Sequence, residues 1–167
     1  MLKNLFLAIA TRLQEAVSDI QFIDLWNANI EYISGGAVWP TPAVFVEFDP
    51  IEWHQQGRLG RMADVGVRLH IVTREVKHNG VTDDRINTDL LRLDLASDIN
   101  VAMQTLHGEG FTTPMLTNTT TNHNHTELVE DVQRYVTRLQ DNAATPTLVG
   151  AGAAVQLEIR NSSGQTD

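Results

Sequence analysis

Two histidines and a glutamate at alternating positions form the part of this sequence best suited to chemistry. His123, His125 and Glu127 stand two residues apart in the stretch TNTTTNHNHTELVEDVQRY, residues 117 to 135. Side chains of an extended chain alternate between two faces, so these three would point the same way. Two imidazoles and a carboxylate can bind Zn or Fe, although such a site usually needs a further protein ligand.

A polar turn is the other interpretation of these residues, and it is the one we prefer. The remaining histidines form no second spaced cluster, and the surrounding Asn and Thr residues are typical of a loop. The sequence contains no cysteine and no nucleophile-elbow, P-loop or dinucleotide-binding motif. We therefore predict no catalytic, cofactor-binding or metal-binding residues, no cofactor and no enzymatic activity.

The chain is acidic, with 21 acidic and 12 basic residues and a formal net charge of −9 over 167 residues. Proteins that bind nucleic acid phosphates cluster Lys and Arg, so tight DNA binding is not expected here. An acidic surface either repels DNA that must pass it or simply keeps a soluble protein dispersed. No stretch approaches the roughly 18 apolar residues of a membrane span.

Hydrophobic periodicity predicts the elements of the first half of the chain. The apolar residues of the first segment recur at helical spacing, whereas those from residue 64 onward alternate as in a strand with one buried face. The predicted elements are a helix over 2–18, a strand over 21–26 that could continue through 27–33, a turn at 34–36, a strand over 43–48, an exposed hairpin loop over 54–62 and a strand over 64–73.

The second half is predicted in the same way. Its elements are a polar loop over 74–83, a helix over 84–107 closed by His107-Gly108, a short extended piece and then a loop over 110–125, a strand over 127–141 with a helix as the alternative, a loop, a strand over 153–160 and a frayed tail over 161–167. This order predicts an α+β fold, with a mixed, mostly antiparallel sheet and two main helices packed on one face. Residues 1–160 are expected to form a single domain.

The candidate interaction residues lie in the polar loops and beside them. Alternation also places Arg68 and His70 on one polar face of their strand, and Arg134 and Arg138 on a polar face of theirs. Trp is enriched at protein interfaces, which adds one aromatic residue to the set. The candidates are Trp53, Arg58, Arg61, Lys77, His78, His123 and His125.

Several segments together resemble the tail terminator, or tail completion, proteins of long-tailed bacteriophages. After the amphipathic N-terminal helix come FIDLWN at 22–27 and P-x-PAVFVEF at 40–48, which IEW follows. A strand ending in IVTR, a helix containing DLLRLDLASDINVAM and the strand EDVQRYVTRLQD extend the resemblance to about residue 141. No catalytic residues belong to that family, so none are carried over.

The resemblance implies a structural role in the virion. Such proteins form a hexameric ring on the last ring of the tail tube, end tube polymerisation and present the surface that joins the head. The partners would be other copies, the tail tube protein and a neck or head-completion protein, and DNA would pass through the lumen without specific binding and with no membrane involved. The protein would lie in the tail-neck region of the virion, and in the host cytoplasm before assembly.

A ring through which DNA passes should line its lumen with Asp and Glu.

Other functions stay open at this stage. A head-completion or connector neck protein is the alternative of the same class. A plain interaction domain, and a small metal-dependent enzyme built on His123 and His125, are the alternatives from other classes.

Overall fold

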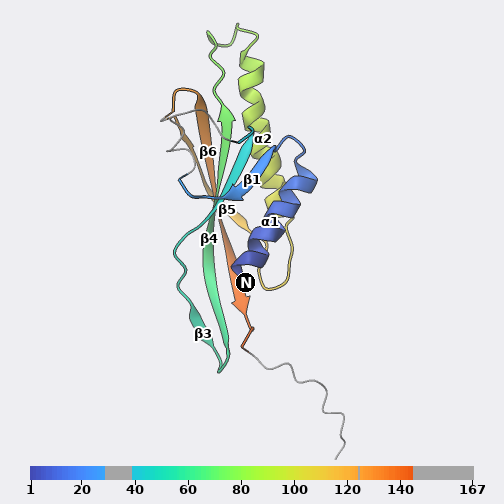
Figure 1. Cartoon of the computed structure of the whole chain (residues 1–167), viewed down its shortest axis with the longest axis vertical. Coiled ribbons are helices and arrows are strands. Elements are labelled where there is room, and N and C mark those ends of the chain that lie inside the picture. The colour runs from blue at the N-terminus through green and yellow to red at the C-terminus, as the bar shows by residue number, and fades with distance from the viewer. Residues whose placement is uncertain (29–38, 124, 145–167) are drawn as a thin grey trace, which may run out of the picture.

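Both helices of this protein cover the same face of its sheet (Figure 1). The structure is a computed structural model that describes residues 1–28, 39–123 and 125–144. In chain order its elements are α1 (Leu2–Ala16), β1 (Phe22–Leu25), β2 (Ala43–Phe48), β3 (His54–Gln56), β4 (Gly60–Arg74), α2 (Ile86–Gln104), β5 (Met115–Asn122) and β6 (Leu128–Asp141). The predicted α+β class, with a mixed and mostly antiparallel sheet, is confirmed.

The sheet has the strand order β1-β2-β4-β6-β5, and β3 pairs with one end of β4. Only β1 runs parallel to its neighbour among these pairs, and the others are antiparallel. β4 and β6 pair along nearly their whole length, from Arg61 opposite Asp141 to Arg74 opposite Leu128. The long alternating pattern of β4 makes this possible, because a strand with one apolar face fits a sheet covered on one side.

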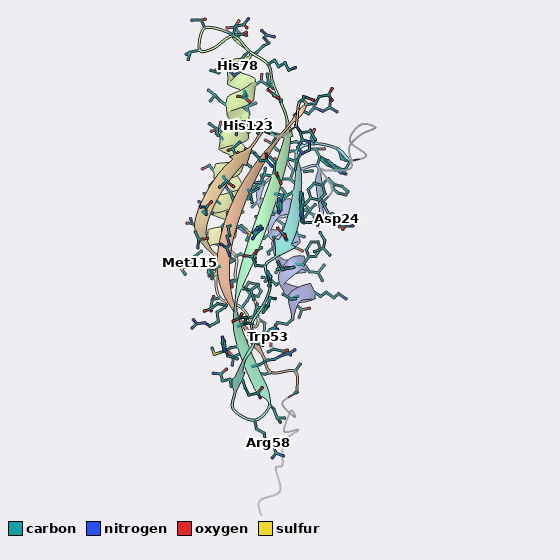
Figure 2. The ribbon with its side chains drawn as sticks, turned by 90° about the vertical axis from the view of Figure 1, so that its left-hand side faces the viewer. Asp24, Trp53, Arg58, His78, Met115 and His123 are labelled. Carbon is teal, nitrogen blue, oxygen red and sulfur yellow. The ribbon has the colours of Figure 1, made fainter. Side chains whose placement is uncertain are left out.

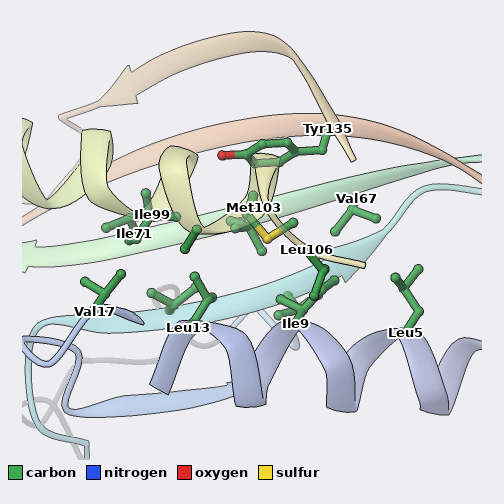
Figure 3. Close-up of a cluster of buried hydrophobic side chains, with 14 of the residues drawn as sticks. Leu5, Ile9, Leu13, Val17, Val67, Ile71, Ile99, Met103, Leu106 and Tyr135 are labelled. Carbon is green, nitrogen blue, oxygen red and sulfur yellow. The ribbon is translucent and has the colours of Figure 1, made fainter. Parts of the chain in front are cut away.

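The core lies between the helices and one face of the sheet (Figure 3). Each helix contributes to the core a stripe of apolar side chains at three- and four-residue spacing. The strands contribute every second side chain. The buried core residues include Leu5, Ile9 and Leu13 of α1, Leu95, Ile99 and Met103 of α2, and Val65, Val67, Leu69, Ile71, Tyr135 and Leu139 of the sheet. Arg12 joins the two helices, donating from Nη2 to the Thr105 hydroxyl at 2.6 Å.

The exposed hairpin loop predicted over 54–62 is a projecting β-hairpin whose two arms are themselves strands. His54 pairs with Met62 and Gln56 with Gly60, around a turn in which Gly57 has a φ of +67°. The sequence predicts the hairpin but not its paired arms, because the segment has no apolar face. A hairpin that extends beyond the core meets water on both faces, so its strands need no hydrophobic alternation.

The loop predicted within 110–125 is wrong, since residues 115–122 form strand β5. β5 pairs with β6 from Met115 opposite Val136 to Asn122 opposite Glu130, with an irregularity between Leu116 and Asn118. Thr favours extended backbone, and a strand at the sheet edge is held by hydrogen bonds to one neighbour alone. The Asn residues and Pro114 were therefore misleading turn signals.

The end of the second helix also differs from its prediction. α2 ends at Gln104, and the hydroxyl of Thr105 donates back to the carbonyl of Val101 at 3.0 Å. Gly108 serves another purpose, because a Cβ there would collide with the ring of Phe111. The glycine was predicted as a helix cap, but it allows close chain approach instead.

The remaining boundaries agree to within a few residues, and residues 127–141 form a strand rather than the alternative helix. Most of the predicted continuation over 27–33, the turn at 34–36, the strand over 153–160 and the tail over 161–167 lie outside the described residues. Across the described ranges, no helix is both long and apolar enough to cross a membrane.

The packing of α1 gives a matched test of the core. Leu13 is fully buried and Leu7 is about half exposed, on the same helix. We expect Leu13→Ala to lower the free energy of unfolding by about 2–5 kcal/mol, because it leaves a cavity under the sheet. Leu7→Ala is the control and should change it by less than about 1 kcal/mol. Urea unfolding measures both, and equal losses would contradict the described orientation of α1.

Candidate functional site

The sheet face opposite the helices, which we call the open face, carries a chain of ion pairs. Arg68 of β4 reaches Glu47 of β2 at 3.4 Å and Asp49 at 2.8 Å, through separate guanidinium nitrogens. Arg134 of β6 donates from Nε and Nη2 to Oδ2 of Asp49 at 3.0 and 2.6 Å. The nearly buried carboxylate of Asp49 therefore links three neighbouring strands.

Gly66 allows that carboxylate to lie against β4. It occupies an open-face position of the strand, and a Cβ there would overlap the carboxylate of Asp49. The backbone amide of Asp49 also donates to the carbonyl of Gly66 at 2.9 Å. A larger residue at this position would push Asp49 away from both arginines, so the glycine supports the ion-pair chain.

His70 is a nearly buried titratable group on the open face, with 6% of its surface exposed. Its Nδ1 lies 2.6 Å from Oε1 of Glu130, and its Nε2 lies 3.0 Å from Oε2 of Glu47. The ring stacks on Trp26 with 3.8 Å between centroids and 5° between planes. The ring is therefore fixed on three sides, by a carboxylate at each nitrogen and by an aromatic face.

Glu130 is a carboxylate stabilised inside the sheet. Burial by itself would raise its pKa, but the hydrogen bond and positive charge of His70, with the amide of Asn122 at 3.0 Å, hold the pKa below its usual value. Hydrogen bonds to the charged form and a nearby cation both favour ionisation. Glu130 therefore contributes to stability mainly in its ionised form.

A hollow of about 710 Å³ lies on the open face over β4, β6 and β5. Its lining combines the ion-pair chain with amide and hydroxyl groups from the edge strand. The lining residues are Trp26, Glu47, Arg68, His70, Asn118, Thr120, Asn122, His125, Glu130, Val132 and Arg134. The hollow can accept a polar surface through many weak hydrogen bonds.

Charges on this face are largely compensated. Glu47, Asp49 and Glu130 face Arg68, Arg134 and His70 through the contacts given above. Further along the sheet Arg138 pairs with Asp64 at 2.8 Å, and the pair lowers the pKa of that carboxyl. Because the arginines are already neutralised, this surface is better suited to a protein partner than to nucleic acid phosphates.

His123, His125 and Glu127, the residues of the alternative metal site, are not brought together. β5 ends at Asn122 and the chain bends through 125–127, so the alternation that would align three side chains is lost. His125 lines the open-face hollow, whereas His123 lines a separate one beside His78. Among the residues that the structure describes, no cluster of three or more His, Asp or Glu side chains is placed to hold a metal ion.

The other candidate residues occupy two opposite ends of the molecule (Figure 2). Trp53 and Arg58 lie at the end formed by the β3–β4 hairpin, and His78 lies at the end formed by the loop before α2. The guanidinium of Arg61 lies 4.5 Å from the Trp53 ring centroid and 2.8 Å from Oδ2 of Asp141. These contacts hold Trp53 at the base of the hairpin, while Arg58 at its tip is exposed.

At the opposite end of the molecule, the carboxylate of Asp83 holds the loop before α2 through hydrogen bonds. Asp83 accepts from both the side chain and backbone of Arg85 and from the backbone of Asn79, and these bonds lower its pKa. His78 lies 3.5 Å from Asp89 at the start of α2, and Lys77 beside it is exposed. The loop thus presents a cation and an imidazole on a fixed turn.

No family model and no curated protein matches this chain. Among solved structures, a chain from the virion of a native gene transfer agent (GTA) particle is similar, with a TM-score of 0.53 and 11% sequence identity. The match covers 82% of this chain and 95% of that chain. At this identity the likeness shows that the two chains share a fold.

Sequence reasoning placed Arg68, His70 and Arg134 on polar strand faces but missed their acidic partners. Glu47 lies in a run that reads as fully buried, and Glu130 lies near the start of its strand. Alternation shows which side a residue faces, but only strand order and register show which charges meet. The spacing of Glu47 and Asp49, two apart, was the one available signal.

The contribution of the Glu130 carboxylate to stability can be tested through its pH dependence. We expect Glu130→Gln to reduce the free energy of unfolding at pH 7 by about 1–3 kcal/mol, because His70 loses its charged partner. The folded-state pKa lies below the unfolded value, so this stabilisation is present above the unfolded pKa and is lost as pH falls through the folded one. The difference from the unmodified protein should therefore shrink on acidification.

Urea unfolding at a series of values between roughly pH 3 and 7 measures this effect. Glu127→Gln is the matched control, because Glu127 is exposed and lies only three residues away. We expect it to leave both stability and its pH dependence nearly unchanged. A loss for Glu130→Gln that stays constant across the series would contradict the ionised pair with His70.

Proposed function

We propose that this protein is a structural virion protein that caps the tail tube as a hexameric ring, ends tube polymerisation and forms part of the head-tail joining interface. The observation that carries the proposal is the shared fold with a chain of a gene transfer agent virion, over most of both chains. Fold alone does not define function, so the proposal also uses the arrangement of the surfaces.

The two motifs that resemble tail terminator proteins are neighbours in space. Residues 22–25 of FIDLWN form β1, and residues 43–48 of PAVFVEF form β2. The two strands run parallel, with Phe22 opposite Ala43 and Leu25 opposite Val46. Two motifs whose paired residues are 21 apart in the sequence thus form one structural unit, which supports reading them as a single family feature.

The shape supports a ring with two different partners. A subunit of such a ring must contact the tail tube at one end and the neck at the other. The hairpin with Arg58 and the loop with Lys77 and His78 lie at opposite ends of an elongated molecule (Figure 2). Contact around the ring would be heterologous, because different surfaces of adjacent copies meet and close only at the correct rotation.

The charges of this protein support a ring through which DNA passes without specific binding. The open-face arginines are paired with carboxylates, and the chain as a whole carries a net charge of −9. We propose that exposed acids line the lumen, for which Asp94 and Asp98 of α2 are candidates. In this function the protein binds other virion proteins and catalyses no reaction.

Electron microscopy of the protein with tail tubes tests the capping role. Tubes assembled with the protein should end in a ring and reach a uniform length, because a capped end adds no further subunits. Tubes that stay uncapped and variable in length would overturn the proposal.

Two charge reversals test whether the ends have different partners. Arg58→Glu at the hairpin tip and Lys77→Glu at the opposite end change the same charge on exposed side chains. Neither should alter the melting temperature by more than a few degrees, since exposed substitutions have small effects. We expect one variant to lose tube capping and the other to retain it, as scored by microscopy. Loss in both, or in neither, would contradict a two-ended subunit.

A further inference from the structure

The loop before α2 contains the one Asn-Gly pair of this sequence, Asn79-Gly80. Both residues are exposed, and the loop lies at the end of the molecule where Figure 2 labels His78. Gly80 has a φ of +89°, and a Cβ there would meet nothing within 4 Å. The glycine has no side chain to shield its backbone nitrogen, so that nitrogen is accessible to the side chain of the preceding asparagine.

The backbone N–H of Gly80 donates to an imidazole, with 3.2 Å between its nitrogen and Nδ1 of His78. Because Nδ1 accepts this hydrogen bond, the proton of the neutral ring is carried by Nε2. That nitrogen lies 3.5 Å from Oδ2 of Asp89 at the start of α2. The carboxylate and the backbone amide therefore hold the ring from both sides and favour one tautomer.

This order of groups is the one that activates a weak nucleophile. A carboxylate orients an imidazole, and the other ring nitrogen accepts the proton of the attacking group. Here the attacking group would be the backbone nitrogen of Gly80, and the electrophile would be the side-chain amide of Asn79. The two groups belong to adjacent residues, so their reaction is intramolecular and closes a cyclic imide.

The side chain of Asn79 is available for this reaction. Its backbone N–H donates to Oδ2 of Asp83 at 2.9 Å, and the N–H of Asp83 donates to the carbonyl of Gly80 at 3.0 Å. Within the part of the chain that the structure describes, no hydrogen bond holds the side-chain amide of Asn79. The backbone of the turn is thus fixed, while the amide can rotate towards the nitrogen of Gly80.

We propose that Asn79 is a site of self-catalysed deamidation, with His78 as the general base. The nitrogen of Gly80 forms a bond to Cγ of Asn79 as its proton passes to Nδ1 of His78. The bond between Cγ and Nδ2 then breaks, and Nδ2 leaves as ammonia with the proton that His78 returns. Water hydrolyses the cyclic imide to aspartate or isoaspartate, so the reaction consumes one water and releases one ammonia.

The reaction changes the charge of one end of the molecule. It adds a carboxylate two residues from the exposed Lys77, in a loop that already contains Asp83. In the proposed function this end contacts another virion protein, and deamidation would make that surface more acidic with time. This consequence rests on the proposed function, whereas the reaction itself does not.

Peptide mass spectrometry of the full-length protein during incubation at neutral pH tests the proposal. We expect Asn79 to deamidate about tenfold or more faster in the folded protein than in the same chain unfolded in denaturant, because folding positions the base. His78→Gln should abolish this difference, and Lys77→Gln at the exposed neighbouring residue is the matched control that should retain it. Asp89→Ala should reduce the difference, and Asp89→Glu should restore part of it.

Three results would overturn the proposal. Asn79 could deamidate no faster in the folded protein than in the unfolded chain. His78→Gln could react as fast as the unmodified protein while keeping its melting temperature. The product could also contain no isoaspartate, which would exclude the cyclic imide. The experiment uses no tail tube, so its failure would leave the proposed capping role untouched, and failure of capping would leave this reaction untouched.

Discussion

The pairing of β4 with β6 is the interaction on which the rest of the structure depends. These two long strands place Val67 opposite Tyr135 under the helices, and Arg68 opposite Arg134 on the open face. A register slip of one residue would exchange the two faces, bury the arginines and expose the core. The hydrophobic core and the charged face are therefore consequences of the same alignment.

Polar contacts under α2 fix how that helix lies on the paired strands of the sheet. Arg92 donates to Asp131 at 2.8 Å, and the amide of Gln133 donates to the carbonyl of Ala96 at 2.7 Å. The hydroxyl of Tyr135, whose pKa is raised by burial, donates to Gln133 at 2.6 Å. These directional contacts between α2 and the sheet restrict the helix to one position, which apolar packing alone would not do.

The open face and the two ends give the molecule three distinct kinds of surface. The open face is polar but compensated, because Asp49 is shared by Arg68 and Arg134. The hairpin and the loop before α2 extend beyond the core, where side chains meet solvent or a partner (Figure 1). The proposed capping role requires such separated surfaces, since contacts with other copies, a tube and a neck must form without blocking one another.

The sequence alone predicts the elements that have strong hydrophobic periodicity. The helix near 2–18, the strand over 64–73 and the strand over 127–141 follow from apolar spacing, and so does the α+β class. It failed where pattern is weak, as in β5 and the β3–β4 hairpin, because edge and projecting strands are held by backbone pairing and need no apolar face.

Which charges form ion pairs, and which histidine contacts carboxylates, depends on how the strands are arranged in the fold. His123 and His125 form the most suggestive spacing in the sequence, yet a bend separates them into different hollows. His70 stands alone in the sequence, yet strand order brings Glu47 and Glu130 to its two ring nitrogens. Spacing along the chain fixes the face on which a side chain lies. Its partners depend on the register between strands, and the two partners of His70 are 23 and 60 residues away in the sequence.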